Sequence, residues 1–277
     1  MARFTTSDGL SLEFEDSGSG LPLLCLPGLT RNARDFDDLK AVLPDGIRMI
    51  CLTSRGRGAS DWDPAIENYA VPVEARDALE LLDHLGLPRA AILGTSRGGL
   101  IAMLLALTSK DRLMGVMMND IGPQIATGGL AVIYDYIGKA PSGKTYEEVG
   151  QALKSTMGAA FPDVPDPRWR VLAERWFVEQ DGGVALRYDP RLRDAVLAQA
   201  EQPQPDLWPF FDALEGVPLA VVRGANSDLL TADSFAEMQA RRPDMIARTV
   251  PNRGHVPFLD EPEALDALTK LIAAIDP

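Results

Sequence analysis

The 277-residue sequence is poor in cysteine and histidine, with two residues of each. Both cysteines, Cys25 and Cys51, lie inside apolar segments, so we expect buried, reduced thiols and no disulfide. We find no partners for a thiolate metal site, and the sequence implies no metal and no organic cofactor. The scarcity of histidine leaves only two candidates for a catalytic base.

Positive charge is also in short supply, because 27 Lys and Arg residues face 40 Asp and Glu residues and the formal net charge is −13. Nucleic acids and anionic membranes are bound through basic surfaces, so neither is an expected partner. The longest apolar run, residues 100–107, is shorter than the roughly 20 residues that cross a bilayer. No signal peptide is visible at the N-terminus. We therefore expect a cytoplasmic protein that acts on a small-molecule substrate.

The pattern of apolar residues predicts an α/β protein. Two alternating segments around Ser7-Asp8-Gly9 predict a β-hairpin. After the hairpin, short apolar strands alternate with helices, which indicates a mostly parallel sheet with helices on both faces. The further strands are expected at 21–26, 48–53, 90–95, 113–119, 218–223 and 246–250, and the helices at 35–43, 72–85, 98–108, 231–241 and 261–275.

The alternation of strands and helices stops after residue 123 and resumes near residue 218. The stretch between contains many prolines, most of the aromatic residues and helical patches at 146–157 and 168–179. It is too long for an ordinary loop. We therefore predict a core domain formed by residues 1–120 and 215–277, with a helical cap formed by residues 121–214.

A G-x-S-x-G pattern, Gly94-Thr95-Ser96-Arg97-Gly98, lies between an expected strand and an expected helix. A serine at such a sharp turn projects above the carboxyl edge of the sheet, and the two glycines let strand and helix approach closely. The pattern predicts Ser96 as a nucleophile.

A serine nucleophile needs a base within hydrogen-bonding reach. His84 ends the helix that precedes the Ser96 strand, which places it at the opposite, amino edge of the sheet. His255 follows the strand at 246–250, at the same edge as Ser96. His255 is therefore the predicted base.

Two aspartates could orient the imidazole, because each follows a strand that ends at this edge. Asp228 is preferred, since its loop neighbours the loop of His255. Asp120, which ends the strand after the Ser96 helix, is the alternative acid, with a role in the hinge of the cap or in backing up the base as its other interpretation.

An oxyanion that develops during ester attack requires two preorganised donors. We expect them to be the backbone N–H groups of Arg97, at a helix N-terminus, and of Leu29, in the loop after the 21–26 strand. The Arg97 guanidinium is expected to pair with a surface carboxylate, or otherwise to hold an acidic group of the substrate.

Five segments, 26–29, 54–60, 94–99, 223–228 and 254–262, together resemble the α/β-hydrolase superfamily. The resemblance implies an eight-stranded, mostly parallel sheet with a cap inserted after the sixth strand. It also implies a triad of Ser96, Asp228 and His255.

The expected function is that of a serine hydrolase that cleaves a small carboxylic ester through an acyl-enzyme. A hydrolase of C–C bonds in diketone-like ring-cleavage products is the nearest alternative, and lactonase or amidase activity also stays open. A ligand receptor that retains the triad without catalysis is the alternative from another class. The fold alone does not decide among these functions.

Overall fold

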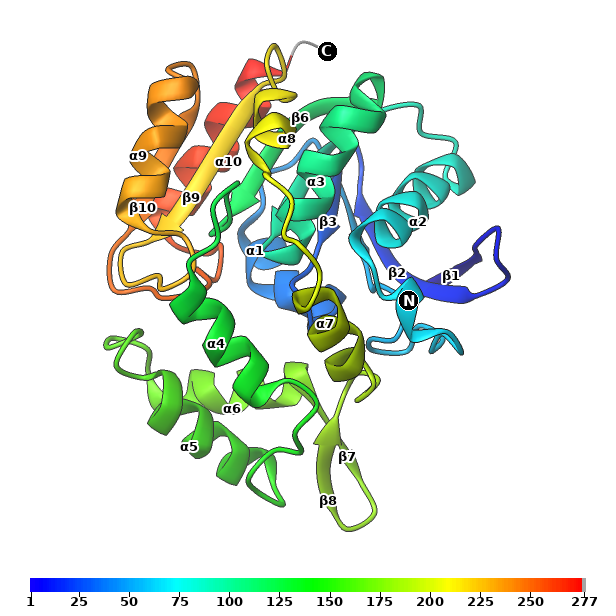
Figure 1. The fold of residues 1–277 in the computed structure, drawn as a ribbon, viewed down its shortest axis with the longest axis vertical. Helices are drawn as coiled ribbons and strands as arrows, with labels where there is room; N and C mark the ends of the chain where they lie inside the picture. The colour runs from blue at the N-terminus through cyan, green and yellow to red at the C-terminus, as the bar shows by residue number, and fades with distance from the viewer. Residues whose placement is uncertain (276–277) are drawn as a thin grey trace.

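The computed structural model describes residues 1–275 and contains an eight-stranded sheet at its centre (Figure 1). The strands lie in the order β1-β2-β4-β3-β5-β6-β9-β10. The pairs β1–β2 and β2–β4 are antiparallel, and the remaining pairs are parallel. The strands are β1 (Ala2–Thr5), β2 (Ser11–Gly18), β3 (Leu21–Leu26), β4 (Ile47–Leu52), β5 (Ala90–Thr95), β6 (Leu113–Asn119), β9 (Leu219–Gly224) and β10 (Ile246–Val250). The predicted fold class is thereby confirmed.

Helices cover both faces of the sheet because consecutive strand residues point to opposite sides. In β5, Ile92 packs in the apolar layer on one face and Leu93 in the layer on the other, and both are fully buried. The first layer is completed by α2 (Val71–His84), α3 (Arg97–Thr108), α8 (Trp208–Asp212) and α9 (Ala232–Arg241). The second is completed by the 3₁₀ turn η1 (Ala33–Phe36), α1 (Asp37–Val42) and α10 (Pro262–Ala274).

Cys25 and Cys51 lie side by side in the second layer, as paired residues of β3 and β4. Both thiols are buried and free, as predicted. His84 ends α2 and packs against the rings of Phe4 and Phe14.

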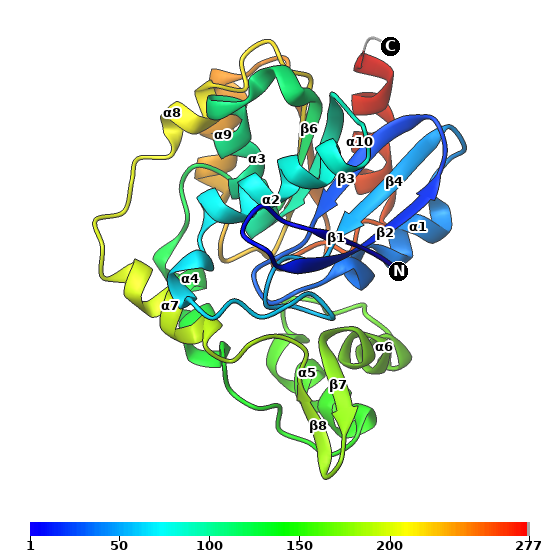
Figure 2. The same ribbon diagram turned by 90° about the vertical axis from the view of Figure 1, so that its right-hand side faces the viewer.

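The chain between β6 and β9, called the insertion below, runs from residue 120 to 218. Its first helices are α4 (Thr127–Tyr136), α5 (Tyr146–Met157), α6 (Asp166–Trp176) and α7 (Leu192–Ala200). Figures 1 and 2 place these helices together, beyond the carboxyl ends of the central strands. The helix α8, by contrast, packs against α3 in the first layer, where Phe211 is fully buried. Within the part of the chain that the structure describes, no helix is long and apolar enough to cross a membrane.

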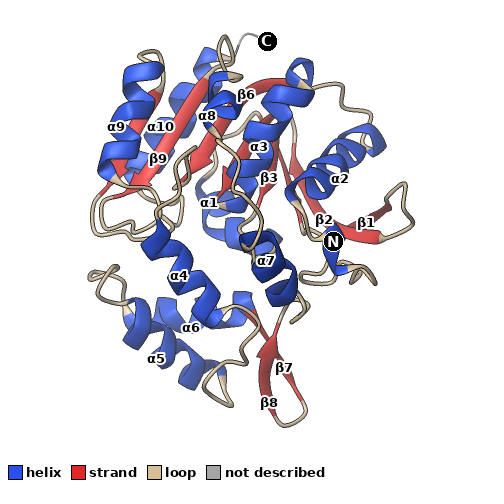
Figure 3. Ribbon diagram, in the orientation of Figure 1, coloured by secondary structure: helices blue, strands red, loops and turns tan. Residues whose placement is uncertain are grey.

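One expected helix in the insertion is wrong at its C-terminal end, in residues 177–179. The patch at 168–179 ends as a helix at Trp176, and Phe177–Gln180 forms the strand β7 instead (Figure 3). This strand pairs with β8 (Gly183–Leu186) in an antiparallel hairpin. The turn contains Gly182 and Gly183, with φ of 93° and 144°, a conformation that glycine supplies and that favours a tight hairpin.

Candidate active site

Ser96 occupies a strained turn between β5 and α3. Its φ of 52° and ψ of −114° are rare for a residue with a side chain, and such a conformation costs on the order of 1–3 kcal/mol. The turn depends on the flanking glycines. A Cβ at Gly94 would lie 2.4 Å from the carbonyl carbon of Gly98, and a Cβ at Gly98 would lie 2.1 Å from the carbonyl oxygen of Leu26. The sharp strand–turn–helix geometry expected from the sequence pattern is therefore present.

His255 lies in the loop after β10 and reaches Ser96 along the carboxyl edge of the sheet. Its Nε2 is 2.9 Å from Ser96 Oγ, and its other ring nitrogen, Nδ1, is 2.7 Å from Oδ2 of Asp120. The amide of Asn119 supports this loop by donating a hydrogen bond to the carbonyl of Pro257. The structure thus brings a hydroxyl, an imidazole and a carboxylate together in series.

The carboxylate in this series is that of Asp120, which directly follows β6. The residue has a φ of 56°, and its side chain is completely buried. The backbone N–H of Gly224 donates to Oδ1 at 2.8 Å, and the hydroxyl of Ser227 donates to Oδ2 at 2.6 Å. These bonds fix the carboxylate so that Oδ2, which accepts from Ser227, is also directed at His255.

The preference for Asp228 as the acid is wrong on geometry. Asp228 is exposed in the loop after β9, and no described residue forms a hydrogen bond with its side chain. The hydrogen bonds of Ser227 explain why Asp228 is exposed. The Ser227 hydroxyl donates to Asp120 and accepts the N–H of Leu230 at 3.1 Å. This turn brings Ser227, the residue before Asp228, against the buried carboxylate. The alternative acid named from the sequence, Asp120, is the residue that contacts His255.

The series of three groups can move a proton. A carboxylate only accepts hydrogen bonds, so Nδ1 of His255 carries the hydrogen that Asp120 accepts. The neutral imidazole then presents its lone pair at Nε2, toward the hydroxyl of Ser96. This arrangement can take the proton of Ser96 and stabilise the resulting imidazolium beside the carboxylate.

The residues of the two predicted oxyanion donors both lie near Ser96. Arg97 is the first residue of α3, and Leu29 follows Gly28, whose Cβ, if present, would be 3.8 Å from Ser96 Cβ. Neither backbone N–H donates a hydrogen bond to another described residue. Both amides are therefore available to a ligand at Ser96, and their catalytic role remains a prediction.

The sequence led us to expect that the Arg97 guanidinium pairs with a carboxylate at the surface, but the structure places it in the interior. It is buried and donates from Nε to Glu74 Oε2 at 2.6 Å and from Nη2 to the carbonyl of Tyr69 at 2.9 Å. Glu74 also accepts from Arg57 at 2.7 Å, and Arg57 donates to the carbonyl of Leu29 at 2.8 Å. Burial alone would raise the pKa of Glu74, but the two arginines outweigh burial and hold that pKa below its usual range. One buried carboxylate thus connects the residues of both predicted oxyanion donors.

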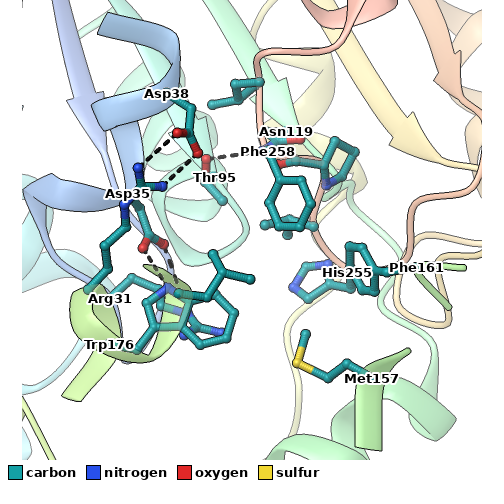
Figure 4. A pocket seen from close by; sticks show the side chains of 15 residues that line it. Arg31, Asp35, Asp38, Thr95, Asn119, Met157, Phe161, Trp176, His255 and Phe258 are labelled. Carbon is teal, nitrogen blue, oxygen red and sulfur yellow. Dashed lines mark hydrogen bonds and ion pairs between the residues drawn. The ribbon is translucent and has the colours of Figure 1, made fainter. Parts of the chain in front are cut away.

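A small cavity opens beside His255, between the sheet and the insertion (Figure 4). Arg31 and Trp176 lie on one side of it, and Met157, Phe161 and His255 lie on the other. Sequence reasoning missed Arg31, although it stands two residues after Leu29 in the predicted oxyanion loop. That proximity in sequence is the signal that could have identified it.

Comparison with known proteins agrees with this architecture. Residues 23–268 match the model of the alpha/beta hydrolase family. A 3-hydroxybutyrate-oligomer hydrolase of Cupriavidus necator is 36% identical over 90% of this chain and 87% of its own. A 2-(acetamidomethylene)succinate hydrolase of Mesorhizobium japonicum is 28% identical over 96% of this chain and 92% of its own. The crystal structure of an alpha/beta hydrolase from Novosphingobium aromaticivorans superposes with a TM-score of 0.92 at 39% identity, covering 98% of this chain and 97% of that one.

The fold, the strained serine and the family match define a single class of protein. The chain belongs to the α/β-hydrolase family. The two relatives named above are hydrolases.

Proposed function

We propose that this protein is a serine hydrolase that cleaves small carboxylic esters through an acyl-enzyme. Ser96 is the nucleophile, His255 the general base and acid, and Asp120 the residue that orients His255. The observation that carries the proposal is the hydrogen-bonded series from Ser96 Oγ through the imidazole to the buried Asp120 carboxylate.

The reaction follows from this geometry in two halves. As Ser96 Oγ attacks the ester carbonyl carbon, its proton passes to Nε2 of His255, and the carbonyl oxygen becomes an oxyanion near the N–H groups of Leu29 and Arg97. The intermediate collapses, the ester C–O bond breaks, and His255 returns the proton to the departing alcohol. A water molecule then repeats the sequence on the acyl-enzyme, releasing the acid and restoring Ser96.

We further propose that residues 121–214 are a cap inserted into a core domain of residues 1–120 and 215–277, with α4–α7 covering the site and α8, at the end of the insertion, packed against the core. Support comes from the position of α4–α7 beyond the carboxyl ends of the strands and from the cavity enclosed there. Trp169 and Leu172 belong to an apolar cluster within the insertion, which gives this region packing of its own. Covering the site excludes water and strengthens its electrostatic interactions.

The relatives favour catalysis over a receptor role, since both named relatives are hydrolases. One of them acts on oligomers of 3-hydroxybutyrate, which agrees with a small ester substrate. No observation favours cleavage of a C–C bond. Cytoplasmic location also stays a prediction.

The proposal is tested by labelling with a fluorophosphonate probe and by hydrolysis of 4-nitrophenyl butyrate. We expect the probe to label Ser96, and Ser96→Ala to lose labelling and at least about 10³-fold of the turnover, because the nucleophile is gone. Ser155→Ala, at an exposed serine of α5, is the matched control and should behave as wild type. A folded Ser96→Ala protein with wild-type turnover, or cleavage of a diketone panel without ester cleavage, would refute the proposal.

A further inference from the structure

Arg31 differs from every other arginine in the described chain. Each of the others donates at least one side-chain hydrogen bond, whereas the guanidinium of Arg31 donates none. Its nearest carboxylate oxygen, on Asp35, is 3.9 Å from Nε, which is beyond hydrogen-bonding distance. The side chain of Arg31 is nevertheless only 21% exposed. The Arg31 guanidinium, with five N–H donors, thus forms an ion pair with Asp35 but donates no hydrogen bond to a described residue.

The position of Arg31 is fixed by stacking. Its Cζ lies 3.2 Å from the centroid of a Trp176 ring, and Trp176 is itself held by a hydrogen bond of 2.8 Å from its Nε1 to Asp35. Stacking uses one flat side of the guanidinium and leaves its N–H edge available. Arg31 is thus preorganised, which lowers the entropy cost of binding a ligand there.

This guanidinium adjoins the nucleophile. A Cβ at Gly28 would lie 3.4 Å from Arg31 Cγ and 3.8 Å from Ser96 Cβ, so both side chains flank the same glycine. Arg31 also lines the cavity that contains His255 (Figure 4). A small molecule whose reacting carbon sits at Ser96 is therefore within the neighbourhood of the Arg31 guanidinium.

The other charged groups of the cavity already have hydrogen-bond partners in the protein. Arg175 donates to both oxygens of Asp38, at 2.6 and 2.8 Å. Asp35 accepts the indole N–H of Trp176, and its burial raises the pKa of this carboxyl despite the neighbouring arginines. The opposite wall is apolar, with Met157, Phe161 and Phe258. A ligand that fits this cavity would therefore carry a hydrogen-bond acceptor for Arg31, joined to an apolar chain.

We propose that Arg31 binds a carboxylate of the substrate, so that the preferred substrates are monoanionic aliphatic esters, each carrying a free carboxylate besides the ester group. This inference deepens the proposed function and rests on it for the reaction at Ser96. An arginine fork matches a carboxylate with two parallel N–H···O bonds, and such charge-assisted bonds are among the strongest in proteins. Arg31 is accordingly a residue that determines specificity.

The test compares matched esters that differ in one charge. The monomethyl esters of succinate, glutarate and adipate carry a carboxylate, and the corresponding dimethyl esters do not. Hydrolysis is followed by proton release at constant pH. We expect wild type to have a higher kcat/KM for the monoanion of at least one chain length, and Arg31→Met to lower that value by about 10- to 100-fold with little change for its dimethyl ester. Arg31→Lys, which keeps the charge but not the fork, should lie between the two.

A control for net charge is Arg170→Met, on the exposed side of α6, which should leave both kinds of ester unchanged. If wild type prefers the neutral ester at all three chain lengths, the inference is overturned while the proposed function stands. If Arg31→Met impairs neutral and anionic esters equally, Arg31 only supports the cap, and the inference is likewise overturned.

A binding experiment separates this inference from the reaction. Monomethyl glutarate is titrated calorimetrically into Ser96→Ala and into Ser96→Ala combined with Arg31→Met. We expect the second protein to bind at least about 10-fold more weakly, and dimethyl glutarate to show no such difference. Equal binding of the monoester to both proteins would overturn the inference, whatever the outcome at Ser96. Failure of Ser96 to react with the fluorophosphonate, by contrast, would overturn only the proposed function.

Discussion

The two sides of the candidate site are held in different ways. On the sheet side, Asp120 is fully buried, and backbone and hydroxyl donors from the next strand's loop hold its two oxygens. On the insertion side, α6 is tied to the rest of the molecule by ion pairs whose carboxylates, on Asp38 and Asp260, are 24% and 26% exposed. Arg175 pairs with Asp38, and Arg168 pairs with Asp38 and with Asp260.

We infer from this difference that the sheet side holds the reacting groups and that the insertion side covers the substrate. Groups that transfer a proton must keep their distances, and buried hydrogen bonds to rigid strands provide that precision. A segment that covers a substrate must release it, and partly exposed ion pairs break and re-form at little cost. We therefore expect substitutions on the sheet side to lower turnover or global stability, and substitutions on the insertion side to act weakly and mainly on substrate binding.

The largest effect is expected on the sheet side at Asp120. Asp120→Asn replaces the carboxylate that accepts from Nδ1 and can present an N–H to that nitrogen, which favours the wrong tautomer of His255. Turnover of 4-nitrophenyl butyrate should fall by about 10³- to 10⁴-fold in a protein that remains folded by circular dichroism.

Asp228→Asn is the matched control for Asp120→Asn, because Asp228 is an exposed aspartate in the loop after β9, whereas Asp120 follows β6. It should retain turnover within about two-fold of wild type, as substitutions on an open surface generally do. The reverse pattern, with damage at Asp228 alone, would mean that the orienting carboxylate has been misassigned.

The sequence predicts the pairing of Ser96 with His255, whose side chains lie 2.9 Å apart in the structure, because both residues depend on local patterns. Ser96 stands in a strand–turn–helix motif with glycines at fixed spacing, and His255 was the only histidine expected at the carboxyl edge. The alternation of apolar strands and helices likewise predicts the mostly parallel sheet, and the resemblance to the α/β-hydrolase superfamily implies its eight strands.

The carboxylate that contacts His255 was harder to predict, because this contact depends on which loops meet in space. Asp120 and Asp228 each follow a strand that ends at the right edge, and sequence order favours neither. In the sheet, β6 lies directly beside β5, whereas β9 is one strand further from Ser96. The turn that directs Ser227 inward and leaves Asp228 exposed is a tertiary feature.

The contacts of Arg97 with Glu74 and of Arg31 with Trp176 could not be predicted for the same reason. Glu74 comes from α2, and Trp176 comes from the end of α6, far along the chain from the arginines that they contact. Neither contact leaves a periodic signal in the sequence. Long-range contacts of single side chains are therefore the part of this site that required the structure.

A second prediction on the sheet side concerns Glu74. Glu74→Gln leaves Arg57 and Arg97 without their shared counter-charge in a buried place, so the free energy of unfolding should fall by about 3–5 kcal/mol in urea titrations. Asp83→Asn, which breaks the exposed pair with Arg112 at the other end of α2, should cost less than about 1 kcal/mol. Similar losses for both variants would show that the buried Glu74 carboxylate contributes no more to the free energy of unfolding than an exposed one.

The pH dependence of the Glu74 effect follows from the lowered pKa. A carboxyl whose pKa is lower in the folded than in the unfolded state contributes stability above its unfolded value, and the contribution is lost as the pH falls through the folded value. The difference between wild type and Glu74→Gln should therefore stay constant from about pH 8 to 5 and shrink below about pH 4. A difference that instead grows on acidification would contradict this assignment of the charge.

The smallest effect is expected on the insertion side, at Asp38. Asp38→Asn weakens the bonds from Arg175 and Arg168 that hold α6 against α1, but Asn32 still donates to the carbonyl of Arg175 at 2.9 Å. We expect KM for a small ester to rise about two- to five-fold with kcat nearly unchanged, because a loss of roughly 1 kcal/mol or less in cap docking lowers the fraction of closed molecules. Limited proteolysis should cut the insertion faster.

Asp135→Asn supplies the comparison for Asp38→Asn, since Asp135, on α4, is 84% exposed and its one ion pair among the described residues is with Lys139, just after that helix. Its KM and its rate of proteolysis should match those of wild type. Because surface ion pairs are screened by salt, raising the ionic strength from about 0.05 to 0.5 M should move wild type toward the KM of Asp38→Asn. If Asp38→Asn instead lowered kcat as strongly as Asp120→Asn, the insertion would help to set the geometry of the reacting groups, and the distinction between the two sides of the site would fail.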